Sequence, residues 1–131
     1  RFNMRISRQQ KLWTAWGGCA LLIAMLAIAY FSGHIQFMNP ANALRSQAEP
    51  DRFDGLIYIA NKGTEGRRWQ YLVIQTLSND PSPDIREMAV ITLRELGKDA
   101  ASMKCLRKCL ATEKEAIVKE AIKDLLWQWQ P

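Results

Sequence analysis

The side chains that could do chemistry in this chain are few and stand far apart. Cys105 and Cys109 form a C-x-x-x-C pattern, whose spacing of four places both thiols on one side of a helix. A zinc site would need two further ligands, and His34 lies about seventy residues earlier. We therefore favour two free thiols packed inside the protein, although an oxidising compartment would permit a disulfide between them.

His34 is the only histidine, and a lone histidine near an apolar run could ligate a haem or a chlorophyll-type pigment. It has no second ligand beside it and no C-x-x-C-H haem-attachment motif, so we favour an interfacial polar side chain. The sequence also lacks a Ser-His-Asp set, a Walker A motif, a G-x-G-x-x-G motif and an H-E-x-x-H motif. We therefore expect no catalytic residues, no metal and no cofactor.

The longest apolar stretch, residues 12–31, is LWTAWGGCALLIAMLAIAYF. A helix rises about 1.5 Å per residue, so about twenty residues cover the roughly 30 Å hydrocarbon core of a bilayer. The sequence therefore predicts a transmembrane helix over residues 12–38. A cleaved signal peptide is the alternative, because residues 41–43 form an A-x-A pattern, but the apolar run is longer than a signal peptide usually has. We favour an uncleaved anchor.

The basic residues are distributed unevenly along the chain. Four of them precede the apolar run, and no acidic residue accompanies them: Arg1, Arg5, Arg8 and Lys11. They account for most of the net charge of +5, so the rest of the chain is nearly neutral and a nucleic-acid partner is not expected. By the positive-inside rule, the N-terminus is predicted to be cytoplasmic and the C-terminal domain periplasmic or otherwise extracytoplasmic, at an inner (plasma) membrane.

Small side chains recur at spacings of three and four within the apolar run, at Gly17, Ala20, Ala24 and Ala27. Such a face lets a second membrane helix approach closely, so these residues are candidates for contact with a partner helix. A generic alanine-rich helix is the alternative.

The remaining chain divides by composition. Residues 1–11 are a basic tail, residues 39–50 (NPANALRSQAEP) are predicted to be a linker, and residues 51–131 are predicted to be an all-α domain. Residues 51–62 could form a strand or a helix. We favour a helix, because no later segment offers a strand for pairing.

Helical periodicity and end signals predict four further helices after residue 64. Ser82 and Pro83 are a predicted start, Gly97 a predicted stop and Asp99 a predicted cap, and residues 112–115 are read as a capping box. Apolar stripes are expected to face the core. In the second and fourth helices they are Ile85, Met88, Ala89, Thr92, Leu93 and Leu96, then Ile117, Val118, Ala121, Ile122, Leu125 and Trp129. Tyr71, Ile74 and Ile91 lie outside the stripes, and burial is also expected for them.

The segment DPSPDIREMA at residues 80–89, followed by Leu93 and by Leu96-Gly97, resembles the HEAT-like (PBS-lyase-type or armadillo-like) helical repeat. Residues 64–129 hold two units offset by 32 or 33 residues. In the second unit Val118 takes the place of Arg86, with Lys119 next to it. The resemblance implies a small α-α superhelix of two clear helix pairs. Because such arrays normally need about three repeats, residues 51–62 supply a cap or another protein completes the array.

Trp127 lies among charged residues, outside the apolar stripe of its predicted helix, which makes it a candidate contact residue unless it folds back over the helix end. We expect a membrane-anchored protein–protein interaction module, an accessory subunit of a membrane complex whose partners are the bilayer and other subunits. The alternative is a pigment- or cofactor-handling protein, either lyase-like or binding haem or pigment through His34. A soluble secreted repeat module is a third interpretation.

Overall fold

The computed structural model describes residues 22–28 and 39–131, and every regular element within these ranges is a helix. The all-α class is therefore confirmed. Residues 22–28 are helical, and their large apolar side chains are exposed. Within the described part of the chain, no helix combines the length and the apolar character needed to cross a membrane. The rest of the predicted span of residues 12–38 lies outside the described residues.

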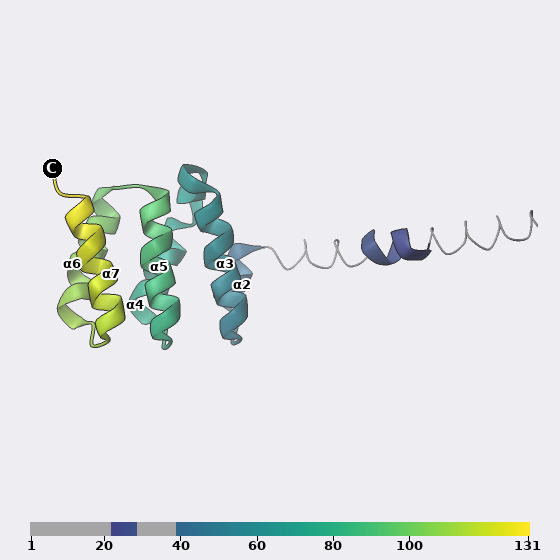
Figure 1. The fold of residues 1–131 in the computed structure, drawn as a ribbon, viewed down its shortest axis with the longest axis horizontal. Coiled ribbons are helices and arrows are strands. Elements are labelled where there is room, and N and C mark those ends of the chain that lie inside the picture. The colour runs from purple at the N-terminus through teal and green to yellow at the C-terminus, as the bar shows by residue number, and fades with distance from the viewer. Residues whose placement is uncertain (1–21, 29–38) are drawn as a thin grey trace, which may run out of the picture. The chain divides into compact units, whose positions relative to one another are not determined.

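Residues 39–131 form a stack of helix pairs (Figure 1). In chain order the elements are α2 (Pro40–Leu44), α3 (Glu49–Asn61), the 3-10 segment η1 (Gly63–Trp69), α4 (Gln70–Asn79), α5 (Pro83–Leu96), α6 (Ala100–Thr112) and α7 (Ala116–Gln128). The pairs are α2–α3, α4–α5 and α6–α7. The second helices of the pairs, α3, α5 and α7, lie next to one another in that order.

Three predicted helix ends are confirmed. The Ser82 hydroxyl accepts a hydrogen bond from the Ile85 amide, and Pro83 occupies the first turn of α5. Gly97 ends α5 with a φ of 92°, a conformation that favours glycine. The Asp99 carboxylate accepts a hydrogen bond of 2.7 Å from the Ser102 amide at the start of α6. These ends depend on local signals, which is why the sequence shows them.

The capping box at residues 112–115 is wrong. Thr112 is the last residue of α6, and Glu115 precedes α7 without a side-chain cap. The Glu113 carboxylate instead accepts hydrogen bonds from the amides of Lys114 and Glu115, at 2.9 and 3.0 Å. It thereby shapes the turn between α6 and α7.

The linker predicted over residues 39–50 is also corrected, because most of this segment is helical. The Asn39 side chain caps α2, and Pro40 and Leu44 are buried against the rest of the unit. Gly55 of α3 allows this contact, since a Cβ atom there would lie 2.9 Å from that of Ala43. Residues 51–62 were predicted to be helical, and residues 51–61 belong to α3, with Lys62 as its C-cap. A third helix pair therefore precedes the two that the sequence shows.

A single hydrophobic core runs through all three pairs. The side chains of Leu56, Leu93 and Ile122, one from each of the second helices, are completely buried. Thr92 links α5 to α3, because its hydroxyl donates hydrogen bonds to the carbonyl oxygens of Met88 and Leu56. The expected stripes of α5 and α7 are mostly buried, with Ile117 as the exception at 50 % exposure.

An arginine clamp connects the second pair to the third. The Arg86 guanidinium donates two hydrogen bonds of 2.9 Å to the two carboxylate oxygens of Glu113. It also donates to the carbonyl oxygens of Asp80 and Pro81, at 2.8 and 3.2 Å, in the turn before its own helix. Both side chains are largely buried, at 15 % and 7 % exposure. One side chain therefore holds its own turn and the next pair together.

The same clamp connects the first pair to the second. Arg52 donates to the carboxylate oxygens of Asp80 at 2.8 and 3.2 Å, and to the carbonyl oxygens of Ser46 and Gln47 at 3.1 and 3.0 Å. These carbonyls lie six and five residues before the arginine, as in the Arg86 clamp. The two clamps thus define a structural repeat of 34 residues, from Arg52 to Arg86.

The clamp predicts a specific dependence of stability on pH. Hydrogen bonds from Arg86 lower the pKa of Glu113 from 4.5 to about 2. Because the pKa of Glu113 is lower in the folded state than in the unfolded state, its ionised carboxylate stabilises the fold at pH values above about 4.5. This contribution disappears as the pH falls from about 4.5 through about 2. We expect Glu113→Gln to lower the free energy of unfolding by about 2 kcal/mol at pH 7. Urea unfolding should show this difference shrinking towards pH 2, and a difference independent of pH would contradict the clamp.

Candidate interaction surface

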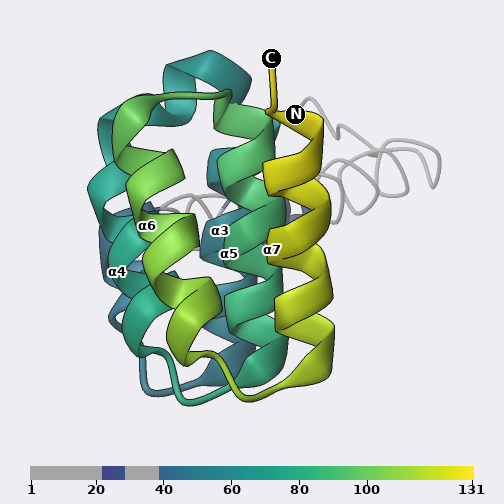
Figure 2. The same ribbon diagram turned by 90° about the vertical axis from the view of Figure 1, so that its left-hand side faces the viewer.

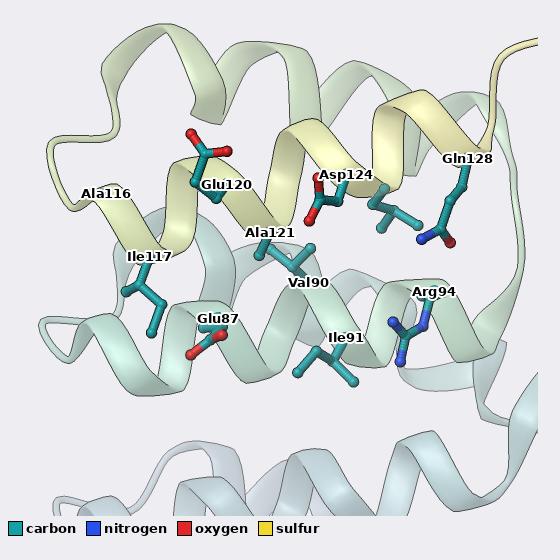
Figure 3. Close-up of a pocket in the computed structure, with 11 residues that line it drawn as sticks. Glu87, Val90, Ile91, Arg94, Ala116, Ile117, Glu120, Ala121, Asp124 and Gln128 are labelled. Carbon is teal, nitrogen blue, oxygen red and sulfur yellow. The ribbon is translucent and has the colours of Figure 1, made fainter.

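A groove with a volume of about 570 Å³ lies between α5 and α7 (Figure 3). Its apolar lining comes from both helices: Val90, Ile91, Ile117, Ala121 and Leu125. Figure 3 shows Ile117 and Ala121 of α7 facing the side of α5 that carries Glu87 and Val90. Because α5 and α7 lie side by side, the groove lies between them and takes its lining from both helices.

The polar residues of the groove carry mostly negative charge. Glu87, Glu120 and Asp124 contribute carboxylates, and Arg94 is the only cation in the lining. Arg94 pairs with Glu95 at 3.3 Å and Glu120 with Lys123 at 3.0 Å, and all four side chains are about half exposed or more. Exposed pairs of this kind contribute little stability and leave the side chains free to rearrange. The groove therefore suits an apolar segment with basic side chains.

Two large apolar side chains of α7 are exposed. The Trp127 side chain is 75 % exposed and Ile117 is 50 % exposed. Trp127 is part of α7 and does not fold back over the helix end, whereas the nearby Trp129 packs partly on the core. Ile117 was expected in the core stripe, but α5 and α6 cover only the side of α7 that bears Val118, Ile122 and Leu125. An uncovered isoleucine and tryptophan on one helix are typical of a contact surface.

Burial was wrongly expected for Tyr71. Its side chain on α4 is 69 % exposed, and its hydroxyl accepts a hydrogen bond of 2.7 Å from Gln75. Ile74 packs partly on the core, and Ile91 lines the groove. Helical periodicity alone does not show whether a residue beside the main stripe has a neighbour.

Cys105 and Cys109 are free thiols on α6, with their sulfur atoms 3.7 Å apart. The Ser78 hydroxyl lies 3.8 and 3.6 Å from the two sulfurs. Hydrogen bonding from Cys105 lowers the pKa of Cys109 to about 6, and the same interaction together with burial raises the pKa of Cys105. Both residues are buried, so a substrate has little access to them. Within residues 22–28 and 39–131, no three His, Cys, Asp or Glu side chains gather as a metal site requires.

Most candidate residues of the N-terminal segment lie outside the described residues. These are His34, Gly17, Ala20, Arg1, Arg5, Arg8 and Lys11. Ala24 and Ala27 lie in the helical residues 22–28 and are exposed. Their contact with a partner helix remains a prediction.

Comparisons with protein-family models, with curated proteins and with solved structures each find no match. A proposal for its function therefore rests on the sequence and geometry of the chain itself.

Adjacent residues of α7 give a direct test of the groove. Ile117 is half exposed, so Ile117→Asp should change the free energy of unfolding by about 0.5 kcal/mol or less. Val118 is completely buried, and Val118→Asp should cost about 3 kcal/mol or more, because it buries an unpaired charge. Thermal melting of the two variants distinguishes them, and equal destabilisation would show that Ile117 faces the core.

Proposed function

We propose that this chain is a membrane-anchored protein–protein interaction module, acting as a non-catalytic accessory subunit of a multi-subunit membrane complex. The observation that carries the proposal is the uncovered surface of α7, where Ile117 opens into the α5–α7 groove and Trp127 is exposed. Large exposed apolar side chains on one helix are characteristic of sites where another protein binds.

The repeated clamp supports a HEAT-like organisation of the stack. Arg52 and Arg86 make the same set of hydrogen bonds one helix pair apart. Helix-pair repeats that bury a shared core typically present extended surfaces along one set of helices. In this chain that set is α3, α5 and α7, and the groove lies between the last two.

The N-terminal sequence supports the membrane anchor and its orientation. Residues 12–31 have the length and composition of a span, and the preceding cations favour a cytoplasmic N-terminus with the helical domain on the opposite side. The small residues Gly17, Ala20, Ala24 and Ala27 would allow close packing against a helix of another subunit. The anchor and the α7 surface would then contact the same complex.

Purification of the full chain in mild detergent tests this function. Native mass spectrometry should show the chain in stoichiometric association with at least one other protein. Trp127→Ala should weaken this association while leaving the melting temperature nearly unchanged, because the side chain is exposed.

Tyr71→Ala is the matched control, since Tyr71 on α4 is an aromatic residue of similar exposure, 69 % against 75 %. It should leave the association intact. The proposal fails if the wild-type chain migrates alone as a monomer, or if the two aromatic variants weaken the association equally.

A further inference from the structure

We propose that the α5–α7 groove binds an apolar segment of a partner protein, and that a lysine or arginine of this segment pairs with Glu87 and Glu120. This inference rests on the proposed function of an interaction module, and it names the chemistry of the partner at that surface. Every residue that lines the groove belongs to α5 or α7. The groove is therefore formed between the second and third helix pairs, inside the stack.

The apolar lining of the groove combines buried and exposed side chains. Val90 and Leu125 are each only 2 % exposed, whereas Ile117 is half exposed and Ile91 and Ala121 are partly buried. A segment that packs against Ile117 removes apolar surface from water, which is favourable. The occupant must therefore bring apolar side chains of its own.

The charges of the groove are arranged along its length. Figure 3 shows Glu87 of α5 and Glu120 of α7 at the same end as Ile117, and Arg94 at the other end, near Gln128. Arg94 follows Glu87 by seven residues, which is two turns or about 10 Å along α5. The end that holds the exposed isoleucine is thus acidic on both helices.

An occupant of this end must supply a cation. Glu87 is half-buried, and within the described ranges of the chain it has no ion-pair partner. Glu120 pairs only with Lys123, in an exposed contact that contributes little stability. Covering a carboxylate with an uncharged apolar segment takes it out of water without compensation, which is costly. A lysine or arginine on the segment replaces the lost water and avoids this cost.

The distribution of charge between the two sets of helices favours the same partner. Helices α3, α5 and α7 hold eight acidic and five basic residues, whereas α2, α4 and α6 hold three basic residues and no acidic one. Figure 2 shows α4 and α6 side by side, with α5 and α7 beside them. Two of the five basic residues, Arg52 and Arg86, are largely buried in the clamps. The helices that form the groove thus belong to the acidic set, and complementary charge guides a basic partner to them.

Short labelled peptides test the inference on the full chain in an uncharged detergent. The probe contains leucine and lysine, the matched peptide has glutamate in place of lysine, and micelles without protein give the background. Fluorescence anisotropy should show that the lysine peptide binds above this background and that added salt weakens the binding. Glu87→Gln combined with Glu120→Gln should weaken it about tenfold or more. The melting temperature should stay nearly unchanged, because neither carboxylate makes a buried ion pair.

Asp54→Asn combined with Glu65→Gln is the matched control. It removes the same two negative charges from exposed positions on α3 and η1, outside the groove. This variant should bind the lysine peptide as well as the wild type does. Equal binding of the glutamate peptide, or unchanged binding by the groove variant, would overturn the inference.

Two other occupants are outcomes of the same experiment. If neutralising the cations of residues 1–11 strengthens peptide binding, the groove holds this chain's own tail and the inference is wrong. It is also wrong if the chain alone forms oligomers that the groove variant dissociates.

Failure of the inference is distinguishable from failure of the proposed function. A chain that keeps its native partner but does not bind the lysine peptide above background rejects the inference and leaves the function standing. A chain that purifies alone, yet binds the lysine peptide through Glu87 and Glu120, supports the inference and rejects the role as a subunit.

Discussion

The stack depends on a buried arginine that joins two helix pairs. Arg52 and Arg86 each bind the carbonyls of their own turn and a carboxylate of the next pair, with little exposure to solvent. Removing one partner of such a pair leaves the other charge buried and unpaired, which is costly. A domain of this size has a thin core, so interactions that fix one pair on the next have a large share in its stability. The clamps also fix the turns that set the direction of α5 and α7.

The position of the clamps decides which surfaces remain open. Both act at the turns before the second helices, and the core fills the space between the helices of each pair. The outward side of α5 and α7 is therefore free to form the groove, where Ile117 remains exposed, and Trp127 is exposed elsewhere on α7. The repeat that stabilises the interior thus also leaves the α5–α7 groove as a candidate binding surface.

The helix ends that depend on neighbouring residues were predicted correctly, whereas features that depend on residues far apart in the sequence were not. Ser82, Gly97 and Asp99 end or begin helices through neighbouring residues, so the sequence alone shows them. The five residues of α2 are too few for a periodic stripe, and its burial depends on packing against α3. The capping box failed because Glu113 binds Arg86, which is 27 residues away. The exposure of Ile117 could not be predicted for a similar reason, since periodicity identifies a face of a helix but does not show where neighbouring helices lie.

A double-mutant cycle on the second clamp tests the account most directly. The free energies of unfolding of Arg86→Ala, Glu113→Ala and the double variant should give a coupling energy of about 2 kcal/mol. The matching cycle between Arg52 and Glu113, which belong to different clamps, should be additive within about 0.5 kcal/mol. Additive effects of Arg86 and Glu113 would contradict the claim that the clamp holds the helix pairs together.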